Sequence, residues 1–352
     1  MRNNSFFCLI LAAAIFVSCN NNDVTMQTTI NANGTCTRAV SYKMVEPKSD
    51  SAAVPVLSTP IPDVLCTDSL WTSSTRVDGD TLVITFTRDF QTVEQMSAEM
   101  PLQINGQRLK AVATIDKRFR WFYTEYTFSE VFASVGSAFP LPITDYVGQD
   151  TASFWFTGYP NLMQGLSGSE SLTKLGSLET YFNKWLNDNM FKLCFDYIVG
   201  HYESVSNPPV SREKFASLRD SLARSLNLYD AVLDIDEANK RFSKFFHSDA
   251  YAVFFNEDNP LGGELIEKYK VLMNIFWFSA DYILSMPGNV VDCGNGICQN
   301  GTIIYPLTGE RMIPQSYTIT ATSRVKHTWA YIVMILIVAT AVCGFVFQRK
   351  RL

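Results

Sequence analysis

Two uninterrupted apolar runs lie near the ends of the chain, and mixed patterns fill the region between them. Residues 6–17 are apolar and follow a short start with one positive charge. This run is too short to cross a bilayer and is typical of a secretory signal, predicted at 1–18. Residues 329–347 contain no charged side chain, and a basic tail follows. About 19 apolar residues match the hydrocarbon core, so we predict a transmembrane helix at 328–348 and a cytoplasmic tail at 349–352.

The first and last parts of the intervening region show the alternation that is typical of β-strands. Residues 24–44 alternate on both sides of the turn sequence Asn31–Gly34, which predicts a hairpin. Residues 119–132 have aromatic side chains on both faces, so we expect this strand to be covered twice or to lie near lipid. Strands are also predicted at 81–88, 109–116, 275–286, 301–305 and 316–323, with a short helix at 93–100 and a proline-rich loop at 47–62.

Between about 172 and 270 the period becomes helical. Seven residues recur at spacings of one, three and four and predict one long amphipathic helix: Leu178, Phe182, Trp185, Leu186, Met190, Leu193 and Cys194. Further helices are predicted at 214–228 and 236–247, with a linker at 256–263 before a last helix. The prediction is therefore an α+β fold in which the helical segment interrupts an antiparallel β-sheet within one extracytoplasmic domain, 19–327. A separate helical domain is the alternative.

Besides Cys19, five cysteines lie in the predicted extracytoplasmic region, an oxidising compartment. Cys293 and Cys298 flank a short turn sequence and are expected to form a disulfide. Cys36 and Cys66 can pair if their strands are neighbours. Cys194 lies among apolar residues and is interpreted as a buried small hydrophobe. A zinc site needs a second cysteine pair or nearby histidines, which the pattern does not offer, so no metal or cofactor is predicted.

Charge and motif content exclude several functions. The net charge of −5 argues against nucleic-acid binding. The three histidines, His201, His247 and His327, have no metal-binding spacing, and His327 is expected at the membrane interface. The sequence has no serine-nucleophile or phosphate-loop motif. We therefore predict a non-enzymatic protein.

One basic and aromatic segment could contact lipid. Arg118 and Arg120 stand beside Trp121, and such a group suits the headgroup region of a bilayer. Ordinary packing within a β-sheet is the alternative interpretation of the same residues.

The segment Phe16-Val17-Ser18-Cys19 resembles the lipobox of bacterial lipoproteins, with Phe16 where leucine is more usual. In that family the cysteine is diacylated and becomes the first residue of the mature protein. The resemblance implies lipidation of Cys19; an ordinary signal with an unrelated cysteine is the alternative. Together with the C-terminal helix, it implies a bacterial inner-membrane protein whose main domain is periplasmic.

The order of these features is similar to LppM-type envelope lipoproteins. The similarity rests on the lipobox, the opening hairpin at Ile30–Gly34, the strand Phe278–Gly288 that ends in Met-Pro-Gly, and the C-terminal span with its basic tail. It covers the ends better than the helical middle, which is larger here, and it assigns no binding residue. It implies binding of lipid or glycolipid.

We therefore expect an envelope lipoprotein that binds a lipid or a membrane-protein partner through its extracytoplasmic domain. The alternative is an accessory or scaffold subunit of an envelope assembly, with the helical segment as its docking face. A hydrolase without a recognisable motif is the third possibility.

Overall fold

The computed structural model describes residues 24–45, 63–79, 81–226 and 235–349. It divides into two compact units. The sheet unit contains the described residues up to Ala133, Ser279–Leu307 and the chain from Tyr317 onward. The helical unit contains Ser134–Phe278 and Thr308–Ser316, and is therefore wider than the helical segment predicted at 172–270. The predicted signal, Cys19, the loop at 47–62 and the end of the basic tail lie outside the described residues.

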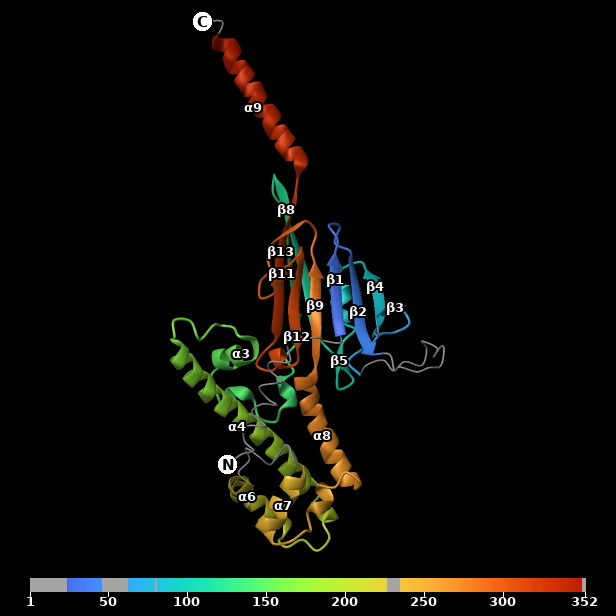
Figure 1. Cartoon of the computed structure of the whole chain (residues 1–352), viewed down its shortest axis with the longest axis vertical. Helices are drawn as coiled ribbons and strands as arrows, with labels where there is room; N and C mark the ends of the chain where they lie inside the picture. Colours follow the sequence, from blue (N-terminus) through green and yellow to red (C-terminus); the bar gives the residue numbers. More distant parts are fainter. Residues whose placement is uncertain (1–23, 46–62, 80, 227–234, 350–352) are drawn as a thin grey trace. The chain divides into compact units, whose positions relative to one another are not determined.

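The larger sheet of the sheet unit has seven strands and is mixed. The predicted hairpin at its centre is confirmed, because β1 (Val24–Ile30) pairs antiparallel with β2 (Cys36–Val45). On its other side β1 pairs parallel with β9 (Ser279–Ser285), so the prediction of a purely antiparallel sheet was wrong. A parallel pair needs a crossover connection, and a long stretch of chain separates β1 from β9. In spatial order the strands are β11 (Ile297–Gln299), β12 (Thr302–Thr308), β9 (Ser279–Ser285), β1 (Val24–Ile30), β2 (Cys36–Val45), β4 (Thr81–Phe90) and β3 (Thr72–Asp78) (Figure 1).

The smaller sheet has four antiparallel strands. Their order is β10 (Asn289–Asp292), β13 (Tyr317–Lys326), β8 (Tyr123–Phe132) and β7 (Ala111–Phe119). The strand predicted at 119–132 begins only at Tyr123, because 120–122 form a turn. The expectation that both faces of this strand are covered was also wrong, because buried and more exposed side chains alternate along β8. The buried residues of β8 are Thr124, Tyr126, Phe128, Glu130 and Phe132.

Two short elements complete the sheet unit before its last helix. The predicted short helix is confirmed as α2 (Val93–Ala98), whose first turn is capped by the Thr92 side chain. It packs on β7, where the Ala113 amide donates to the Ser97 hydroxyl at 2.9 Å. A two-stranded hairpin, β5 (Gln103–Ile104) with β6 (Gln107–Arg108), follows it.

The helical unit is built around one long helix. The predicted amphipathic helix is confirmed as α4 (Gly168–Gly200), with 33 residues and a capping box between Ser167 and Glu170. The helix predicted at 214–228 is two short helices, α5 (Arg212–Ser217) and α6 (Arg219–Leu226). The other helices are α3 (Gln149–Thr157), α7 (Ile235–Phe246) and α8 (Pro260–Trp277), with single 3₁₀ turns at Gly136–Ala138, Ile143–Asp145, Tyr202–Ser204, Ala252–Phe254 and Glu310–Met312.

The bounds of α8 show that two predicted boundaries were wrong. It begins at Pro260, where the Asn259 side chain accepts from the Leu261 amide, so the predicted linker at 256–263 already contains its first turn. It also continues to Trp277, so the strand predicted at 275–286 starts only at Ser279. Pro260 at the first helical position and Asn259 as the cap are ordinary helix-start signals.

The last helix, α9 (Thr328–Arg349), follows β13 almost directly (Figure 1). Its segment Thr328–Phe345 has a mean hydropathy of 2.1, and 6% of it is buried within the protein. A helix of this length and composition can cross a membrane, as the sequence predicts.

Candidate membrane-interface site

The tip of the β7–β8 hairpin is joined to the first turn of α9. Reciprocal backbone hydrogen bonds between Arg120 and Tyr123, at 2.8 and 3.3 Å, close the tip around Trp121 and Phe122. Lys326, at the end of β13, is paired with Tyr123. The chain therefore enters α9 directly beside the hairpin tip, and the short linker cannot carry the helix far from it.

His327 connects the tip to the helix. Its backbone amide donates to the Phe122 carbonyl at 2.8 Å. Its Nδ1 lies 3.2 Å from the Trp121 carbonyl oxygen, which can only accept, so Nδ1 carries the proton. Nε2 lies 2.9 Å from the Thr124 hydroxyl, which donates to it in the neutral ring. His327, which the sequence predicts at the membrane interface, thus links the β7–β8 hairpin to the start of α9.

Contacts between aromatic rings add to these hydrogen bonds. Trp121 packs edge-to-face on Trp329, with ring centroids 5.2 Å apart, and Phe122 lies 5.0 Å from Tyr331. Phe119 stacks on the His327 ring at 5.0 Å. The aromatic collar is defined as Phe119, Trp121, Phe122, Trp329 and Tyr331. Trp121 and Trp329 remain 51% and 47% exposed, so the collar is an apolar surface at the start of an apolar helix.

The three residues predicted to contact headgroups lie together on this hairpin. Trp121 belongs to the collar, and Arg120 is exposed beside it. Arg118 lies on the last part of β7, where its Nε donates to Asp116 at 2.6 Å. Aromatic rings and basic residues at the end of a spanning helix are the arrangement expected at a membrane surface.

A buried ionic cluster, which the sequence pattern does not predict, lies between the two sheets. Arg38 of β2 and Glu130 of β8 are both fully buried, and Nη2 of the arginine lies 3.0 and 2.8 Å from the two carboxylate oxygens. Tyr282 of β9 donates to Glu130 at 2.7 Å, and Nε of Arg38 donates to Thr28 at 3.1 Å. The signal in the sequence is a charged residue at a core position of an alternating strand.

This cluster ties the sheets together and is not open to a ligand, because its charged side chains have no solvent exposure. Burial lowers the pKa of Arg38, but the Glu130 carboxylate and Tyr282 raise it, and the net shift is upward. Burial and the same carboxylate raise the pKa of Tyr282 well above its ordinary value. The arginine is therefore charged and the tyrosine neutral, which is the protonation that these hydrogen bonds require.

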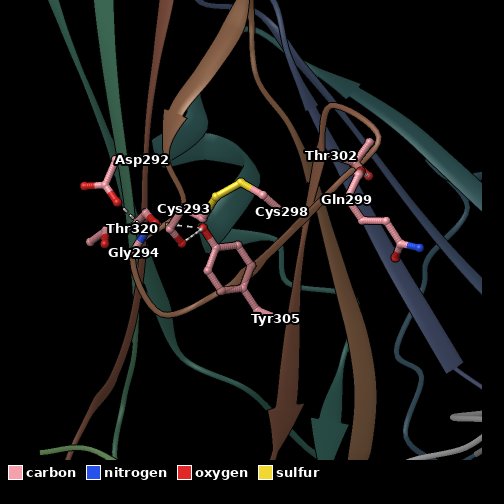
Figure 2. Close-up of a disulfide and its surroundings, with 8 residues drawn as sticks. All are labelled: Asp292, Cys293, Gly294, Cys298, Gln299, Thr302, Tyr305 and Thr320. Atoms are coloured by element: carbon pink, nitrogen blue, oxygen red, sulfur yellow. Dashed lines mark hydrogen bonds between the residues drawn. A yellow bond between two sulfur atoms is a disulfide. The ribbon is translucent and has the colours of Figure 1, made fainter.

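The predicted disulfide between Cys293 and Cys298 is present (Figure 2). It joins the chain after β10, in the smaller sheet, to β11, in the larger one. Tyr305 supports the loop by donating to the Cys293 and Thr320 carbonyls at 3.2 and 2.7 Å. The bond therefore connects the edges of the two sheets as well as closing a small loop.

The possible pair of Cys36 and Cys66 is not formed, and both thiols are free. Cys36 points to the Thr92 carbonyl, before α2, and Cys66 to the Met100 carbonyl, beyond its end, so the two thiols face opposite ends of one segment. Burial raises the pKa of Cys36 to about 11, that of buried Cys194 to about 12, and also that of Cys66. These thiols are therefore protonated at neutral pH and are poor nucleophiles.

One hollow in the described part of the helical unit is small. The hollow lined by Ile143, Val147, Trp155, Leu178 and Phe182 has a volume of about 10 Å³. That is room for about one water molecule and not for an acyl chain. Among the described residues, no group of three or more histidine, cysteine or acidic side chains is placed to hold a metal ion.

No protein-family model, no curated protein and no solved structure matches this chain. The resemblance to LppM-type lipoproteins therefore stays a prediction.

Proposed function

We propose that the chain is a non-enzymatic envelope lipoprotein of the bacterial inner membrane, whose sheet unit binds the lipid surface that α9 crosses. The main support is the packing of Trp121 against Trp329, which fixes the hairpin tip to the start of the membrane helix. When α9 is inserted, Trp329 lies at its boundary, and Trp121 is held to the same depth. The collar then lies at the headgroup level, where tryptophan is favoured.

This arrangement gives the extracytoplasmic region a defined attachment. A flexible linker between β13 and α9 would leave the domain free to move away from the bilayer, whereas the His327 hydrogen bonds and the ring pairs oppose such movement. Lipidation at Cys19 would add a second attachment to the same membrane. In this proposal the lipid ligand is the bilayer surface, because the collar is an exposed apolar surface at the start of α9.

The test is fluorescence quenching of Trp121 by brominated lipid in the full chain, reconstituted into phosphatidylcholine vesicles. Trp121→Phe defines the background, so the difference in emission between the unsubstituted chain and this variant reports Trp121 while Trp329 keeps its place in the protein. We expect the Trp121 emission to be quenched most by lipids brominated near the headgroup end of the acyl chain. Absence of quenching by any brominated lipid would contradict the proposal.

Trp71 offers a matched control within the same unit, since it is 7% exposed and packs on Phe90. Its replacement by phenylalanine should leave the quenching by lipid unchanged. The lipid anchor has a separate test: intact-mass measurement should show a diacylglycerol-sized gain on a chain that starts at Cys19, and Cys19→Ala should abolish it.

A role as an accessory subunit is the second candidate, favoured by apolar side chains on the first half of α4. Leu172 is 71% exposed and Tyr181 is 48% exposed, although α4 belongs to a folded unit. Exposed apolar groups of this kind are typical of a protein contact. Crosslinking in intact cells through a photoreactive residue at Leu172 should then give one defined membrane-protein adduct. If no such adduct forms, the role as an accessory subunit is contradicted.

A further inference from the structure

The register of the smaller sheet gathers basic residues on one face beside α9. Strand β8 lies between β7 and β13, so each of its residues has a partner on both sides. Glu125 is paired with Arg118 on one side and Arg324 on the other. Directly paired residues on neighbouring strands point to the same face, so these three side chains form one row.

A second row lies nearer to the membrane helix. Tyr123 is paired with Lys326 on β13 and, through the hydrogen bonds of the tip, with Arg120. Tyr123 and Glu125 are two residues apart on β8 and therefore share a face. That face is the outer one, because the buried side chains of β8 are at the alternate positions. The basic face is defined as Arg118, Arg120, Arg324 and Lys326.

Two of its four charges are already neutralised. Arg324 forms an ion pair with Glu125 at 2.7 Å, and its guanidinium lies over the Tyr123 ring, 4.6 Å from the centroid. Arg118 pairs with Asp116 of the next row at 2.6 Å. Arg120 and Lys326 are exposed, and none of the described residues forms an ion pair with either. The row closest to α9 therefore carries two uncompensated positive charges on either side of Tyr123.

We propose that the basic face binds the phosphate groups of anionic phospholipids in the bilayer that α9 crosses, with Arg120 and Lys326 as the principal contacts. This inference rests on the proposed function, since the collar must first bring the face to the membrane surface. Lys326 is two residues before α9, and Arg120 is next to Trp121 of the collar, so both cations lie at the depth of headgroups. A guanidinium binds a phosphate through two parallel hydrogen bonds, and an ammonium contributes a point charge.

The test compares two quenchers in one system. The full chain, with Trp121→Phe as the background, is placed in phosphatidylcholine vesicles that contain a minor fraction of brominated phosphatidylglycerol or, separately, of brominated phosphatidylcholine. Each basic residue near an anionic surface adds roughly a fivefold gain in local association, which corresponds to about 1 kcal/mol. We expect brominated phosphatidylglycerol to quench the Trp121 emission at least about twofold more, and the ratio to fall to about one in Arg120→Gln with Lys326→Gln.

The matched control is Lys240→Gln with Lys244→Gln, which removes the same charge from exposed positions on α7 of the helical unit. This control should keep the preference for the anionic lipid. In the protein without charge substitutions, added salt should reduce the preference, because exposed charges are screened.

The outcomes separate the two proposals. Equal quenching by both lipids would contradict the binding of anionic phospholipids by the basic face and leave the proposed function standing. A preference that survives the double substitution or high salt would have the same meaning. Failure of both lipids to quench Trp121 would overturn the proposed function itself.

Discussion

The two units of this chain have cores of different chemistry. At the centre of the sheet unit, Arg38 and Glu130 form a buried ion pair across 92 residues of sequence, and Tyr282 reaches the same carboxylate across 152. The centre of the helical unit is aromatic: Phe215 is fully buried and stacks on Phe195 with centroids 5.0 Å apart. Hydrogen bonds between charged groups depend on direction, whereas apolar packing depends mainly on shape.

This contrast indicates how each unit excludes other arrangements. A slipped register in the sheet unit would bury an unpaired charge, which is a large penalty. In the helical unit a shifted ring loses contacts gradually, and neighbouring rings can adjust. The core of the first unit should therefore be sensitive to a change in chemistry, whereas the aromatic core of the second should tolerate a moderate change in volume.

The largest effect is expected from Glu130→Gln, which preserves the shape and removes the charge. The amide nitrogen would face the Arg38 guanidinium, donor against donor, and leave a buried cation unpaired. We expect a loss of about 3–5 kcal/mol in the free energy of opening of β1, β2 and β8. Native-state hydrogen exchange of the full chain in detergent micelles measures this quantity.

Asp78→Asn is the control for that substitution. Its ion pair with Arg76 is 3.4 Å long and both side chains are at least 69% exposed. Its removal should cost less than about 0.5 kcal/mol. A cost for Glu130→Gln as small as this would show that the buried pair does not hold the two sheets.

A smaller effect is expected from Glu310 of the helical unit, through pH. Burial raises the pKa of its carboxyl from 4.5 to about 7, and nearby Arg311 only partly offsets this. The folded protein therefore favours the neutral carboxyl, and stability declines as the pH rises from about 4.5 to about 7. We expect the helical unit to lose roughly 2 kcal/mol between pH 5 and pH 8, and Glu310→Gln to remove most of this loss.

Thermal unfolding at a series of pH values measures the difference between the two proteins. Glu267→Gln is the matched control, because that side chain is 67% exposed on α8. It should retain the pH dependence of the unsubstituted protein. Identical pH profiles for Glu310→Gln and the unsubstituted protein would exclude Glu310 as the cause.

The smallest effect is expected from Phe215→Leu, although it removes more volume than the change at Glu130. Leucine keeps the site apolar, and the rings of Phe246 and Tyr251, at 5.4 and 5.1 Å, can move toward it. We expect a loss of roughly 1–1.5 kcal/mol in the free energy of opening of the helical unit, measured by hydrogen exchange. A loss as large as that of Glu130→Gln would remove the distinction between the two cores.

Prediction from sequence succeeded where the pattern was regular and failed where elements meet. The hairpin around Asn31–Gly34 and the helix α4 follow from alternation and from helical period. The turn at 120–122 was missed because its aromatic residues continue the apolar pattern of the strands around it. The junction of α8 with β9 was misplaced for the same reason, since Phe276 and Phe278 alternate across it.

The candidate site was predicted only in part. Arg118, Arg120 and Trp121 were recognised as a group because they are neighbours in sequence. The link from this group to α9 was not predicted, because His327 meets the Trp121 carbonyl across 206 residues. Nothing in a local window indicates which strand will lie beside β8.

The sequence by itself determined the elements whose forces act over short separations: the apolar helix α9, the amphipathic helix α4 and the disulfide between Cys293 and Cys298. Tertiary structure alone decided the parallel pairing of β1 with β9, the buried ion pair, and the approach of the hairpin tip to α9. Hydrophobic period and loop closure are local properties of a chain. The register between distant strands depends on which arrangement buries the apolar faces while pairing the buried charges, and only the complete fold satisfies both conditions.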